Sequence, residues 1–140
     1  MAGPTHLLDT SVLARASKPQ VAARIAAMMD AGELATCAVT DLEVLFSARS
    51  GAEHRERRAD LQLRFFSVAL DAGVFARALE VQGLLADRGQ HRAASIPDLV
   101  VAAAGELAGL AVLHYDGDFE LIASVTGQRA EWVVPRGSVD

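Results

Sequence analysis

The sequence has little of several features that would fix its class at once. It carries one cysteine, Cys37, and one lysine, Lys18, among 140 residues. A single cysteine excludes an internal disulfide framework and a zinc site built from several thiolates, so we interpret Cys37 as a small buried hydrophobic residue. No apolar stretch reaches the roughly 18 residues of a membrane span, because the best candidate, residues 99–113, is short and contains Glu106.

The N-terminus lacks the basic segment and the long apolar run of a secretory signal peptide. We therefore expect a cytoplasmic protein that makes no use of a membrane. Hydrophobic residues make up 51% of the chain, which is too many for a disordered protein. The length suits one domain, which we expect to cover residues 1–140 with a core of about residues 5–135.

The chain also has no excess of positive charge, and its formal net charge is −5. Proteins that hold nucleic-acid phosphates unaided usually present a basic surface. An acidic chain that acts on phosphate therefore needs divalent cations, a local patch of arginines, or both. The basic residues are almost all arginine, but genome composition can produce the same bias, so we give it little weight.

Hydrophobic patterns and turn signals predict an alternation of strands and helices. The predicted strands are residues 6–8, 34–39, 66–70, 110–113 and 132–134. The predicted longer helices are residues 20–31, Thr40 through Phe46, 51–64, Asp71 to just before Gly89, Pro97 to a stop near Gly109, and 119–125. This order predicts a three-layer α/β domain with a central, mostly parallel sheet of four to five strands flanked by helices.

Acidic residues fall where such a sheet binds its ligands. Asp9 follows the first predicted strand, and Asp116 and Asp118 follow the fourth. Ligands of open α/β sheets bind outside the carboxyl ends of the strands. Glu43 and Asp98 lie in the first turns of helices that follow strands, so they begin at the same edge. We expect all five carboxylates to converge.

Such a cluster needs a cation, because neighbouring carboxylates raise one another's pKa. Hard divalent cations such as Mg²⁺ or Mn²⁺ bind carboxylate and water oxygens. No pair of histidines has the spacing of a zinc site. The sequence therefore predicts a metal site with oxygen ligands only.

Each acid also has a purely structural interpretation. Thr40 and Glu43 match a capping box, and Asp98 could simply face the positive end of its helix. Asp9 could cap the short helix that it precedes, and residues 116–118 could form only a turn. Their joint placement at one edge favours the metal site.

Four segments resemble the PIN-domain nucleases, and among them the VapC-type toxins of bacterial toxin–antitoxin pairs. These segments are residues 7–13 (LLDTSVL), 40–45 (TDLEVL), 96–103 (IPDLVVAA) and 112–119 (VLHYDGDF). They occur in the family's order at similar spacing, so the resemblance spans nearly the whole chain. One departure is His114, where many relatives have a threonine or serine.

The resemblance implies an endoribonuclease that depends on Mg²⁺ or Mn²⁺ and cleaves structured RNA such as tRNA or rRNA. It implies that Asp9, Glu43, Asp98 and Asp116 are the metal-site acids, Glu43 through a water if not directly, with Asp118 in or near the site. It also implies a PIN-like fold, a homodimer, and inhibition by a small VapB-like antitoxin that inserts a segment into the active-site groove.

The expected mechanism is hydrolysis of a phosphodiester at one or two bound cations. An acid that does not bind metal, with Asp118 the candidate, would accept the proton of the attacking water. Ser11 or Thr10 would bind a metal-ligated water or a phosphate oxygen. The arginines expected to approach RNA are Arg49, Arg55, Arg57, Arg58 and Arg92, although a solvated helix face is the favoured explanation of residues 55–58.

Other classes fit the residues less well. A haloacid-dehalogenase-type phosphatase needs a second aspartate two residues after Asp9, where this chain has Ser11. A receiver domain needs a late lysine, and this chain has none. A catalytically silent PIN-like binding module and a PIN-like nuclease of RNA processing or of DNA remain open alternatives.

Overall fold

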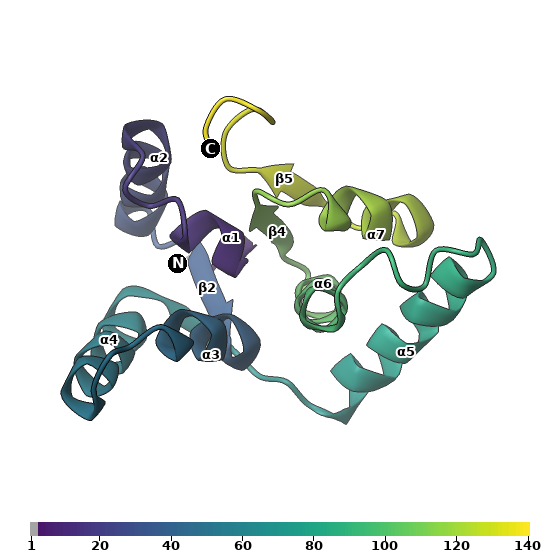
Figure 1. Ribbon diagram of the computed structural model, residues 1–140, viewed down its shortest axis with the longest axis horizontal. Helices are drawn as coiled ribbons and strands as arrows, with labels where there is room; N and C mark the ends of the chain where they lie inside the picture. The colour runs from purple at the N-terminus through teal and green to yellow at the C-terminus, as the bar shows by residue number, and fades with distance from the viewer. Residues whose placement is uncertain (1–2) are drawn as a thin grey trace.

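The computed structural model describes residues 3–140, which form one parallel sheet with helices on both faces (Figure 1). Within these residues the sheet has five strands in the order β3-β2-β1-β4-β5, and every neighbouring pair is parallel. The strands are β1 (His6–Leu8), β2 (Leu34–Cys37), β3 (Phe66–Val68), β4 (Ala111–His114) and β5 (Ala130–Trp132). The predicted α/β class is confirmed.

One or two helices connect each strand to the next, and because all strands are parallel, each crossover returns to the same edge of the sheet. They are α1 (Thr10–Leu13), α2 (Pro19–Asp30), α3 (Ala38–Phe46), α4 (Gly51–Arg64), α5 (Ala72–Ala86), α6 (Ile96–Ala108) and α7 (Asp118–Thr126). No helix within residues 3–140 has both the length and the apolar character needed to cross a bilayer.

Two hydrophobic clusters separate the three layers. Successive side chains of a strand point to opposite faces, and the central strand β1 accordingly sends Leu7 into one cluster and Leu8 into the other. Leu7 packs with residues of α5, α6 and α7, whereas Leu8 packs with residues of α1 and α2. The cysteine interpretation is also confirmed, because Cys37 is a free and fully buried thiol in the first cluster.

Helix α6 lies especially close to the sheet. A methyl group on Gly105 would lie 3.0 Å from Val112 Cγ2 and 3.4 Å from the Leu110 carbonyl oxygen. Glycine therefore allows α6 and β4 to lie closer together than a residue with a side chain would. The helix ends at Gly109, as predicted, with the left-handed φ of 72° that favours glycine at this position.

Besides the end of β3, which is Val68 rather than residue 70, two predicted boundaries are wrong by two residues. Helix α3 begins at Ala38 rather than Thr40, because β2 ends at Cys37 and passes into the helix without a loop. The last strand, predicted at residues 132–134, lies at Ala130–Trp132, where its residues pair with β4. In both places the apolar run continues past the end of the strand, so hydrophobicity alone could not mark the boundary.

Candidate metal centre

Asp9 and Asp116 follow the two neighbouring strands at the centre of the sheet. Leu8 of β1 pairs with Leu113 of β4, and the Asp9 amide donates to the Leu113 carbonyl over 3.0 Å. The two acids therefore leave the sheet side by side at its carboxyl edge. The Asp9 side chain also caps α1, since one oxygen accepts a hydrogen bond from the Ser11 amide at 2.9 Å.

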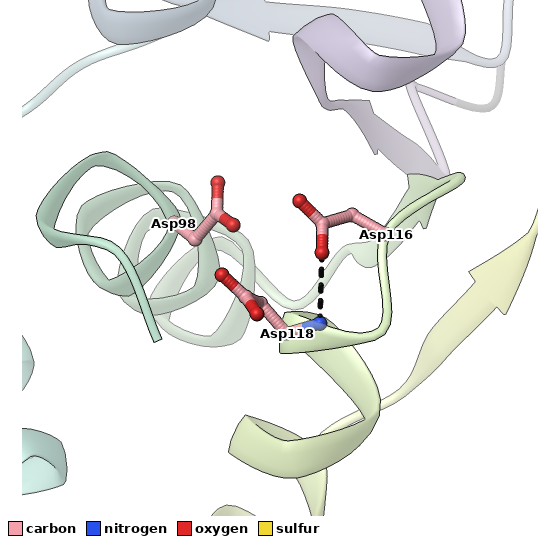
Figure 2. A group of neighbouring side chains, drawn as sticks. All are labelled: Asp98, Asp116 and Asp118. Atoms are coloured by element: carbon pink, nitrogen blue, oxygen red, sulfur yellow. Dashed lines mark hydrogen bonds between the residues drawn. The ribbon is translucent and has the colours of Figure 1, made fainter. Parts of the chain in front are cut away.

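Asp98, Asp116 and Asp118 form the tightest group of acids (Figure 2). Each offers one carboxylate oxygen, and these oxygens all lie within 4.8 Å of one another. Asp98 comes from the first turn of α6, Asp116 from the loop after β4 and Asp118 from the start of α7. A hydrogen bond of 2.9 Å from the Asp118 amide to the Asp116 carboxylate holds the loop.

Ser95 orients two members of this group. Its hydroxyl caps α6 by accepting a hydrogen bond from the Asp98 amide at 3.2 Å, and its own amide donates to the Asp118 carboxylate at 3.2 Å. The sequence pattern predicts that this helix begins at Pro97 and gives no role to Ser95, but α6 begins at Ile96 with Ser95 as its cap. A serine three residues before an acid and ahead of an apolar run is a recognisable signal for the start of a helix. Pro97 is a second such signal two residues later, and the predicted boundary lies there.

Burial and mutual repulsion disfavour full ionisation of the cluster. Burial, a hydrogen bond shared with Asp118 and the charges of the neighbouring acids, including Asp9 and Asp116, raise the pKa of Asp98 to about 9. Burial also raises the pKa of Asp9, with a contribution from Asp116. In addition, Asp9 Oδ1 is buried and has no hydrogen-bond partner within the described chain.

These features suit a hard divalent cation. The donors are carboxylate oxygens, one of which is buried and unpaired, and a bound cation would remove the repulsion among them. A buried polar atom without a hydrogen-bond partner destabilises the folded protein. An ion bound by Asp9 Oδ1 would remove that destabilisation. Asp98, Asp116 and Asp118 could hold the ion, with Asp9 beside them.

Glu43 lies at the same edge but outside the tight group. Its carboxylate accepts a hydrogen bond of 3.0 Å from the Thr10 hydroxyl, next to Asp9. The capping-box interpretation is wrong, because Thr40 lies inside α3 and its buried hydroxyl donates instead to the Leu8 carbonyl over 2.9 Å. This bond ties α3 to the end of β1 and places Glu43 near Asp9.

The hydroxyls of Thr10 and Ser11 already have partners within the protein. Thr10 donates to Glu43, and the Ser11 oxygen accepts a hydrogen bond from the Tyr115 amide at 2.9 Å. The bond to Tyr115 joins the segment after β1 to the loop after β4. The Ser11 hydroxyl therefore fixes the relative positions of the segments that carry Asp9 and Asp116, whereas Thr10 ties the Asp9 segment to α3.

His114, the departure from the family pattern, lies fully buried at the end of β4. Its ring packs against Phe119 and Trp132, with centroid distances of 5.1 and 4.9 Å. Burial lowers the pKa of His114 to about 4, so the ring is neutral near pH 7. Nδ1 accepts a hydrogen bond of 3.2 Å from the Asp116 amide, which assigns the proton to Nε2.

The predicted arginines differ in their surroundings. Arg57 pairs with Glu53 and also donates to Ser47, whereas Arg49 is 89% exposed and lies 3.6 Å from Glu53. Arg92 is exposed in the turn that precedes α6, and it forms no ion pair with any residue of the described chain. Arg92 is thus free of ion pairs within the described residues, whereas Arg49 is highly exposed but pairs with Glu53.

Arg55 and Arg58 lie on α4. The Arg55 guanidinium lies beside the start of its own helix at Gly51. Arg58 helps to line a cavity of about 530 Å³ between α3, α4 and β3, which contains none of the five predicted acids. The acidic site therefore lies outside this cavity, at the carboxyl edge of the sheet.

Comparison with known proteins agrees with the fold. The sequence model of the PIN domain matches residues 6–125. The ribonuclease VapC51 of Mycobacterium tuberculosis is 48% identical over 135 residues, which cover 96% of this chain and 97% of that protein. The ribonuclease VapC21 of the same species is 44% identical over 133 residues, covering 95% and 96%.

Solved structures share the arrangement of elements at low sequence identity. The VapBC2 complex of Rickettsia felis bound to a promoter DNA fragment matches with a TM-score of 0.74 at 11% identity, covering 91% of this chain and 97% of that one. DNA-bound VapBC of Salmonella typhimurium matches with a TM-score of 0.74 at 17% identity, covering 94% and 99%. These likenesses show the shared fold, and the sequence matches place the chain in the PIN-domain family, within its VapC group.

Proposed function

We propose that this chain is a divalent-metal-dependent endoribonuclease and the toxin of a bacterial toxin–antitoxin pair. The observation that carries the proposal is the convergence of acids from separate segments on one edge of the sheet, in a chain 48% identical to a protein named as a VapC ribonuclease. Structured RNA such as tRNA or rRNA is the substrate class that the family suggests.

The metal-site acids in this proposal are Asp9, Asp98 and Asp116, with Glu43 acting directly or through water. Asp118, whose carboxylate lies in the tight group with Asp98 and Asp116 and could also hold the ion, is assigned here to proton transfer. Their oxygens suit Mg²⁺, and Mn²⁺ has similar ligand preferences. When bound, the cation would stabilise negative charge on the scissile phosphate and make water a better nucleophile.

The side chains around the ion have separate tasks. Asp98 gives up its proton when it becomes a ligand, because the pKa of its carboxyl is about 9 in the metal-free protein. Asp118, oriented by the Ser95 amide, is the candidate to accept the proton of the attacking water. Ser11 joins the segments that follow β1 and β4, and Thr10 holds the Glu43 carboxylate near Asp9. Arg49 and Arg92 would meet the phosphates of the RNA.

Cleavage of RNA by the purified protein tests the catalytic part of this proposal. We expect cleavage with Mg²⁺ or Mn²⁺, none with EDTA, and a loss of at least about 100-fold in Asp9→Asn and Asp116→Asn. Asp30→Asn, at the end of α2, is the matched control and should keep full activity. Equal activity of the parent and both site variants would refute the assignment.

The toxin role requires a partner, for which we propose a small VapB-like antitoxin encoded beside this chain. Production of the chain alone should stop cell growth, and production together with the neighbouring small protein should restore it. Asp9→Asn should be harmless in both settings. Light scattering of the purified chain would test the homodimer that the family resemblance implies. Growth inhibition by Asp9→Asn equal to that of the parent would contradict a toxic action through RNA cleavage.

A further inference from the structure

The most exposed large hydrophobic residue in the described chain is Phe46, the last residue of α3. Its exposed fraction is 90%, compared with 50% for Phe66 and 49% for Phe75. A phenylalanine normally stabilises a fold by leaving water, so an almost fully exposed ring contributes little to folding. The ring of Phe46 is therefore free to contact a ligand.

Phe46 lies beside the acidic edge. It follows Glu43 by three positions on the same helix, which places the two side chains on neighbouring parts of one face. Together with Leu42, these residues line an open hollow of about 360 Å³, which we call the α3 hollow. Glu43 is bonded to Thr10, the neighbour of Asp9, so the hollow adjoins the proposed metal centre.

The surroundings of the ring suit a nucleotide. Arg49, three residues further on, is 89% exposed and lies 3.6 Å from the Glu53 carboxylate, so an RNA phosphate would compete with Glu53 for it. Leu42 supplies a second apolar surface that is 68% exposed. A volume of about 360 Å³ is near the lower end of the range for small-ligand sites. Proteins bind unpaired bases by stacking them on exposed aromatic rings while cations contact the adjoining phosphates.

We propose that the Phe46 ring stacks on an unpaired base of the RNA substrate, next to the phosphate that is cleaved, with Arg49 contacting an adjoining phosphate. This inference rests on the proposed ribonuclease function and adds a base-binding site to it. A protein that covers Phe46 is the alternative occupant of the α3 hollow, and it is one of the outcomes of the test below.

The test uses a short single-stranded RNA that carries 2-aminopurine, whose fluorescence falls when the base stacks. Binding is measured with Mg²⁺ in the Asp116→Asn background, which prevents cleavage. Phe46→Leu should remove most of the fluorescence quenching and weaken binding about 5- to 150-fold, the range of about 1–3 kcal/mol for one stacked base. Phe46→Trp should retain both, because it keeps an aromatic face.

Phe75→Leu, a half-exposed ring on α5, is the matched control and should behave as the parent. Unchanged quenching and affinity in Phe46→Leu would overturn the inference. So would a Phe46→Leu variant that binds RNA normally but changes its oligomeric mass or its affinity for the antitoxin. If the chain without substitutions cleaves no RNA with Mg²⁺ or Mn²⁺, the proposed function fails. If it cleaves RNA and Phe46→Leu has no effect, only the stacking site fails.

Discussion

The Thr10 hydroxyl donates a hydrogen bond of 3.0 Å to the Glu43 carboxylate across 33 positions of the chain. This bond joins the segment that carries Asp9 to helix α3. We expect Thr10→Val to let the Glu43 side chain move and to raise the Mg²⁺ concentration for half-maximal RNA cleavage about fivefold, for a loss of about 1 kcal/mol. Thr10→Ser keeps the hydroxyl and should match the parent, and an equal shift in both variants would contradict this role.

Asp98 makes the metal-free protein sensitive to pH. Its folded pKa is about 9, above the ordinary value of 3.8, so the protonated carboxyl favours the folded state. This contribution is complete at pH below about 4 and is lost as pH rises toward 9. Asp98→Asn removes the titration, and we expect it to be about 1–3 kcal/mol more stable than the parent at pH 8 in EDTA.

Urea unfolding at pH 5 and pH 8 would measure this difference in the free energy of unfolding. The parent should lose stability between the two pH values, and Asp98→Asn should lose less. Added Mg²⁺ should stabilise the parent and leave the variant unchanged. If Asp98→Asn is less stable than the parent at pH 8 without metal, the Asp98 carboxyl does not destabilise the folded protein, and the prediction is wrong.

Cation binding should depend on pH for the same reason. A cation that binds the ionised Asp98 must displace a proton at any pH below about 9. We expect the affinity for Mg²⁺ to rise up to about tenfold for each pH unit between pH 6 and pH 8. Titration calorimetry in two buffers with different ionisation enthalpies should detect the release of about one proton, and an affinity that is constant over this range would contradict the prediction.

His114 positions the loop that carries Asp116. His114→Phe preserves a ring between Phe119 and Trp132 but removes the acceptor of the Asp116 amide. We expect the free energy of unfolding to fall by about 1–3 kcal/mol and the affinity for Mg²⁺ to fall several-fold. His114→Asn offers an oxygen to the same amide and should recover part of the metal affinity, a pattern that simple loss of packing would not produce.

Local signals in the sequence predicted much of the structure correctly. Asp71 caps α5 through a bond from the Val74 amide, and Gly109 ends α6. These features depend on residues close together in the chain. The convergence of the acids at one edge could also be predicted, because the rules of parallel sheets bring every strand end to the same side.

Contacts between distant segments could not be read from local patterns. Thr40 carries the signature of a helix cap, but a buried bond to Leu8 determines its role. Phe46 matches the apolar period of its helix, and the sequence gives no sign that its side chain faces solvent. The bond from Ser95 to Asp118 likewise joins two loops whose meeting depends on the packing of α6 against the sheet.

The central place of β1 in the sheet has a consequence for synthesis of the chain. β1 is made first, but its second neighbour, β4, lies near the end of the sequence. Asp9 therefore has no acid beside it while most of the chain is still being translated, and Asp116 reaches it only when nearly the whole domain has left the ribosome. We expect the nascent chain to be harmless to the ribosome that makes it, because its catalytic edge is the last part to be assembled.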